Sequence, residues 1–71
     1  MQDAHARNLR AAAAETGTLT VRSIPSGQEA LVGGRKIGLT PVRIVGAKPG
    51  AHDVQVLFEK GAWECSARVD A

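Results

Sequence analysis

The chain has 71 residues, 44% of them apolar, and nine Lys and Arg against seven Asp and Glu give a formal net charge of +2. This length holds one domain with a light core, because the apolar residues are mainly aliphatic and Phe58 and Trp63 are the only aromatics. The basic residues are scattered along the sequence, which favours a solvated surface over the clustered basic face that binds nucleic acid, and no stretch approaches the roughly 18 apolar residues of a membrane helix.

Residues 1–16 are rich in alanine, which favours helix by propensity. Leu9 is nearly the only sizeable apolar side chain there, so a helix would have no apolar stripe to bury. We therefore expect a fraying linker or a helical stalk over residues 1–16 and a β-module over residues 17–71. Docking of the first segment against the module is the alternative.

From Thr18 onward the apolar residues recur every second position, which is the signature of half-buried strands. The clearest example begins at His52, where Val54, Val56 and Phe58 alternate with polar residues. Six strands are expected: Thr18 to Arg22, Ala30 to Val32, Arg35 to Ile37, a strand from Val42, His52 to Glu59, and Trp63 to Asp70.

Glycine and proline mark the connections between these strands. Gly33 and Gly34 suit the two-residue turn of a tight hairpin, in which both residues have positive φ. Gly46, inside a strand, suggests a bulge and leaves the direction of Val45 open. Residues 48–50, Lys-Pro-Gly, have the order of a type II turn.

Short strands at such close intervals predict an all-β fold, a small antiparallel β-sandwich of six or seven strands. The residues on the apolar phase of each strand should form its core. They are Leu19, Val21, Val32, Ile37, Val42, Ile44, Val54, Val56, Phe58, Trp63, Cys65, Ala67 and Val69.

Three short motifs, GTLTVRSIPSG from Gly17, GLTP from Gly38 and PGAHDVQV from Pro49, together resemble the PEGA domain, a β-sandwich module of bacteria and archaea. The resemblance extends from Gly17 to Val69. Gln28 departs from it, since the family has alanine after the motif glycine, and so does the Gly33–Gly34 hairpin, where the family favours Asp-Gly. Ala62 before Trp63 leaves the register of the last hairpin open.

The resemblance implies a module without catalytic residues, metal or cofactor, and hence no enzyme. It implies a protein-interaction or adhesion role in a larger bacterial signalling chain, such as a serine/threonine kinase, or in a cell-envelope protein. An extracytoplasmic location follows from it, with a cytoplasmic one as the alternative.

Residues with reactive side chains favour structural roles. Cys65 lies on the apolar phase, where a buried, inert thiol is expected, and the ring of His52 should bond to nearby backbone. With His5 the only other soft ligand, a zinc site is not expected. Carboxylates on the polar phase should serve solubility and cross-strand pairing with Arg68 or Lys60. They are Asp53, Glu59, Glu64 and Asp70.

Leu57, Leu39 and Ile24 lie off the core phase or in turns, where single exposed apolar residues are common. If they cluster with Val45, they mark a contact surface, and an exposed strand edge is another route to a partner. Trp63 is interpreted as core, and as a stacking platform if it is exposed. The expected partner is a protein or a neighbouring domain of the same chain, and a weak homo-oligomer is also considered. The rival functions are a carbohydrate- or cell-wall-binding module and an inert spacer.

Overall fold

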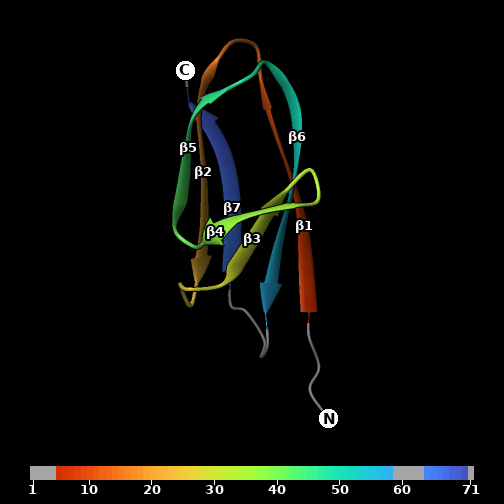
Figure 1. Cartoon of the computed structure of the whole chain (residues 1–71), viewed down its shortest axis with the longest axis vertical. Coiled ribbons are helices and arrows are strands. Elements are labelled where there is room, and N and C mark those ends of the chain that lie inside the picture. Colours follow the sequence, from red (N-terminus) through yellow and green to blue (C-terminus); the bar gives the residue numbers. More distant parts are fainter. Residues whose placement is uncertain (1–4, 59–63, 71) are drawn as a thin grey trace.

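The computed structural model describes residues 5–58 and 64–70, which form seven β-strands (Figure 1). Each strand lies antiparallel to its neighbours, and the strands divide between two sheets. The strands are β1 (His5–Ala13), β2 (Gly17–Ile24), β3 (Glu29–Val32), β4 (Arg35–Leu39), β5 (Val42–Ala47), β6 (Gly50–Phe58) and β7 (Glu64–Asp70).

The four-stranded sheet has the order β1-β6-β3-β4, and the three-stranded sheet has the order β5-β2-β7. The edge strands β1 and β7 also contact each other, which closes one side between the sheets. The predicted all-β antiparallel sandwich is therefore confirmed, and the six expected strands correspond to β2 to β7.

The helix or linker expected over residues 1–16 is wrong for the residues that the structure describes. β1 pairs with β6 over its whole length, from His5 opposite Phe58 to Ala13 opposite Gly50. As a strand, this segment places Leu9 and Ala11 on the inner face and covers the edge of β6. Tertiary contacts thus override the helical propensity of its alanines, because an isolated helix here would bury nothing.

The core between the sheets consists mainly of the predicted aliphatic residues. Leu19, Val21, Val54, Val56 and Phe58 are all buried. Seven further predicted core residues are partly buried against them, and Trp63 lies outside the described residues. The seven are Val32, Ile37, Val42, Ile44, Cys65, Ala67 and Val69.

Small residues complete this core, and the apolar pattern did not identify them. Ala11, Ala30 and Ala47 are all buried, and each comes from a different strand. A methyl side chain leaves room for the larger residues of the facing sheet, so alanine counts as core here although its hydrophobicity is slight.

Positive φ angles confirm the predicted Gly33–Gly34 turn and the predicted bulge at Gly46. Gly33 and Gly34, at φ 60° and 83°, join β3 to β4. In the β2–β5 pair, Gly17 lies opposite Ala47 but Thr18 lies opposite Val45, so Gly46 is the extra residue of a bulge, at φ 79°. Val45 points outward from this bulge and is 84% exposed.

The bulge gives a first testable prediction. A Cβ at Gly46 would meet nothing within 4 Å, so the cost of Gly46→Ala is conformational rather than steric. We expect Gly46→Ala to lower the free energy of unfolding by about 1 kcal/mol, measured by urea denaturation. Gly46→Asn should cost less, because asparagine tolerates positive φ. Equal losses in the two variants would contradict this explanation.

Candidate functional site

Two buried hydroxyl groups tie together loops that are distant in the sequence. Ser23 at the end of β2 is 8% exposed, and Thr40 before β5 is 3% exposed. Their hydroxyl oxygens share a hydrogen bond, and Ser23 Oγ also donates to the carbonyl of Pro25 at 2.8 Å. The backbone N–H of Gln28 donates to Thr40 Oγ1 at 3.0 Å.

The directions of these bonds follow from counting protons, since each hydroxyl has one to donate. The Ser23 proton goes to Pro25 O, so the proton in the shared bond is that of Thr40. Backbone bonds reinforce the same corner, from Gly27 N–H to Thr40 O at 2.7 Å and from Thr40 N–H to Gln28 O at 2.8 Å. The loop after β2 is therefore fixed to the chain before β5.

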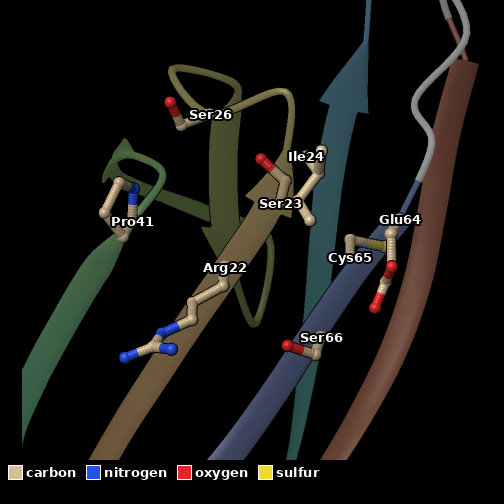
Figure 2. A pocket seen from close by; sticks show the side chains of 8 residues that line it. All are labelled: Arg22, Ser23, Ile24, Ser26, Pro41, Glu64, Cys65 and Ser66. Carbon is tan, nitrogen blue, oxygen red and sulfur yellow. The ribbon is translucent and has the colours of Figure 1, made fainter.

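An open groove of about 470 Å³ lies beside this corner, at the end of the β2–β7 pair (Figure 2). Ser23 and Cys65 are paired across the two strands at this end, as are Ile24 and Glu64. The lining residues are Arg22, Ser23, Ile24, Ser26, Pro41, Glu64, Cys65 and Ser66.

The polar groups that the groove offers to a ligand come from its exposed lining residues, not from its buried ones. The Ser23 hydroxyl already donates to Pro25 O, and Cys65 packs against the core. Arg22, Ser26 and Ser66 are exposed, and Figure 2 shows the Arg22 side chain extending away from β7. These groups suit hydrogen bonding to an anionic or polar partner.

The outer face of the four-stranded sheet carries three leucines. Leu39, Glu29 and Leu57 are directly opposite one another on β4, β3 and β6, so they form one row across the sheet. Leu31 lies two residues beyond Glu29 on the same side of β3. We call Leu31, Leu39 and Leu57 the leucine face. Leu39 is 59% exposed, and the other two are half-buried outside the core cluster.

The predicted contact residues therefore divide between the two sides of the sandwich. Leu39 and Leu57 belong to the leucine face, whereas Val45 lies on the outer face of the three-stranded sheet, as does Ile24. Trp63 lies outside the described residues. Their role in binding stays a prediction, but Leu57, Val45 and Leu39 do not form one patch.

Among known proteins, the family model of the PEGA domain matches residues 16–61, which is more than half of the chain. The chain belongs to the PEGA domain family. No curated protein and no solved structure matches. PEGA domains are small, non-catalytic and generally extracellular or periplasmic. Within residues 5–58 and 64–70, no helix has the length and hydropathy to cross a membrane.

The hydrogen-bonded hydroxyl groups of Ser23 and Thr40 explain two of the motifs that carry the PEGA resemblance. Ser23, Pro25 and Gly27 belong to the first motif, and Thr40 belongs to the second. Their side-chain and backbone bonds join at one corner of the module. The residues of both motifs therefore maintain a loop connection, which is a structural role.

The family match leaves out two strands that complete the PEGA module in this chain. β1 precedes residue 16 and β7 follows residue 61, and the two strands contact each other. β1 covers the edge of β6, and β7 covers the edge of β2. The seven-strand sandwich thus depends on segments that lie outside the matched range.

Charged and polar side chains of the PEGA module show a different pairing from the one expected. Asp53 accepts a hydrogen bond from Arg10 of β1 at 3.3 Å, an exposed cross-strand pair that the helical interpretation of the first segment could not predict. Asp70 pairs with Arg68 at 2.9 Å along the same strand rather than across strands. Glu64 is exposed, and the expected residues Glu59 and Lys60 lie outside the described residues.

The two remaining reactive residues have structural surroundings. The Nε2 atom of His52 lies 2.6 Å from the carbonyl oxygen of Lys48, which confirms the expected bond to nearby backbone. Cys65 packs against the core from β7 but is only half-buried, so it is less enclosed than expected.

Proposed function

We propose that this PEGA module is a non-catalytic protein-interaction module of a larger extracytoplasmic protein, and that it docks through the leucine face. The parent would be a bacterial envelope protein or a signalling protein such as a serine/threonine kinase. The observation that carries the proposal is the row of Leu39, Glu29 and Leu57 across the outer face of the four-stranded sheet.

The leucine face leaves apolar area exposed, which a docked partner would remove from water. Removing a large aliphatic side chain from water contributes about 1.5 to 3 kcal/mol when burial is complete. Leu39 is 59% exposed and has most of this contribution still available. Glu29, between the leucines, forms an ion pair with Lys36 at 3.3 Å, so a partner that covers the face does not bury an unpaired carboxylate.

Thiol labelling of the full-length parent protein in its native envelope tests this proposal. Leu39→Cys is made in a Cys65→Ser background, and its labelling rate is compared with that in the isolated 71-residue chain. We expect at least a tenfold slower rate in the parent, because a docked partner covers the position. Glu15→Cys, in the exposed bend between β1 and β2, is the matched control and should label at the same rate in both settings.

The rival functions make different predictions in the same system. Equal labelling at positions 39 and 15 in the parent would contradict docking and favour an inert spacer. A shift of the tryptophan fluorescence of the chain on titration with cell-wall fragments would favour a carbohydrate-binding module, since Trp63 is the only tryptophan.

A further inference from the structure

The outer face of the three-stranded sheet carries three arginines around its centre. Arg43 and Arg68 lie on either side of Thr20, as its direct partners on β5 and β7. Arg22 follows two residues after Thr20 on the same side of β2, opposite Ser66. We call Arg22, Arg43 and Arg68 the arginine face.

Most of the positive charge on this face is available to a partner. In the described part of the chain, the ion pairs involve Arg10, Lys36 and Arg68, which leaves Arg22 and Arg43 without a carboxylate partner there. Both residues are exposed. Their neighbours Thr20 and Ser66 supply hydroxyl groups that can bond to the same anionic oxygens.

The two ends of the face differ from its centre. At one end Val45 lies opposite Thr18, which lies opposite Asp70, and at the other end Ile24 lies opposite Glu64. Val45 is 84% exposed and Ile24 is 58% exposed, so each end combines an apolar side chain with a carboxylate.

We infer that the arginine face binds an acidic, extended segment of a protein partner, with carboxylates over the centre and aliphatic residues over the two ends. This inference rests on the proposed interaction function and adds a second surface to it. Guanidinium groups pair well with carboxylates, and arginine beside aliphatic residues is typical of protein interfaces. The apolar ends favour a protein over a phosphate polymer, which has no side chains to cover them.

The strand geometry fixes the spacing of the partner. Successive rows on one face of a sheet are two residues apart, about 6.7 Å, so the four rows from Val45 to Ile24 span about 20 Å. An extended peptide presents every second side chain to the same side at the same spacing. Four alternate positions in the order apolar, acidic, acidic, apolar therefore match the face.

Two heptapeptides test this register by nuclear magnetic resonance at physiological ionic strength, where long-range attraction is screened. The first has the order Val, Thr, Glu, Thr, Glu, Thr, Val. The second has the same composition in the order Glu, Thr, Val, Thr, Val, Thr, Glu, which places carboxylates against Asp70 and Glu64. We expect the first peptide to shift amide signals of β5, β2 and β7 and to bind at least fivefold more tightly than the second.

Charge variants assign the binding to this face. Arg22→Gln combined with Arg43→Gln should weaken binding of the first peptide about tenfold, equivalent to about 1.4 kcal/mol. Arg10→Gln combined with Lys36→Gln makes the same change of net charge on the other sheet and should leave the affinity within about twofold, because those cations are remote and already paired. Circular dichroism confirms that each variant is folded.

Several results would overturn the inference. They are equal affinity for the two peptides, equal losses in the two double variants, absence of shifts on β5, β2 and β7, and tighter binding of inorganic polyphosphate at the same amides. The labelling test at position 39 concerns the opposite sheet. Slower labelling at position 39 in the parent, with no peptide binding, would contradict the arginine-face inference alone. Failure of both tests would contradict the proposed interaction function as well.

Discussion

Ala11→Asp is expected to lower the free energy of unfolding by about 3 kcal/mol, because it places a carboxylate on the inner face of β1. Ala11 is 4% exposed and belongs to the core cluster. A domain of this size has a total stability of roughly 4 to 10 kcal/mol, so the variant should lose a large part of it. Thermal unfolding followed by circular dichroism should show a midpoint lower by about 12 to 24 °C.

The neighbouring residue provides the control for this variant. Ala12 is exposed on the outer side of the same strand, opposite Ala51. Ala12→Asp should change the stability by less than about 1 kcal/mol, as surface substitutions do. In a fraying linker or a solvated helical stalk the two substitutions would have similar small effects. Similar effects would therefore contradict the placement of β1 in the four-stranded sheet.

Thr40→Val is expected to cost about 2 kcal/mol, although it preserves the size of the side chain. The valine removes the acceptor of the Gln28 N–H and the proton that Thr40 gives to Ser23 Oγ. Thr40 is 3% exposed, so water cannot easily replace these bonds. Urea denaturation measures the loss, with Thr20→Val on the outer face of β2 as a matched control that should stay within about 0.5 kcal/mol.

A double-mutant cycle with Ser23→Ala tests whether the two hydroxyls act together. Ser23→Ala alone should cost about 2 kcal/mol, because it removes both the bond to the Pro25 carbonyl and the acceptor of the Thr40 proton. If the bonds form one chain, the double variant should lose less than the sum of the single losses by about 1 kcal/mol. Strict additivity would show that the hydroxyls contribute independently.

The candidate surfaces could be predicted from the sequence only in part. The sequence pattern identified Leu57 and Leu39 as lying off the core phase or in turns, but it did not decide the direction of Val45, which the structure shows to be exposed. It could not show that Leu39 shares a row with Leu57 while Val45 lies on the other sheet, because strand order depends on contacts between distant segments. Arg22, Arg43 and Arg68 appeared scattered for the same reason, since their common face exists only once β5, β2 and β7 are paired.

Local pattern alone determined the positions of β2 to β7, the Gly33–Gly34 turn, the Gly46 bulge and most of the core. These features depend on backbone preferences and on alternation within a few residues, so neighbouring residues in the sequence are enough to predict them. Tertiary structure alone decided that residues 5–13 form a strand and that Ser23 meets Thr40. In both cases the stabilising partner lies far along the chain, so the free energy that selects the conformation does not exist until the sheets assemble.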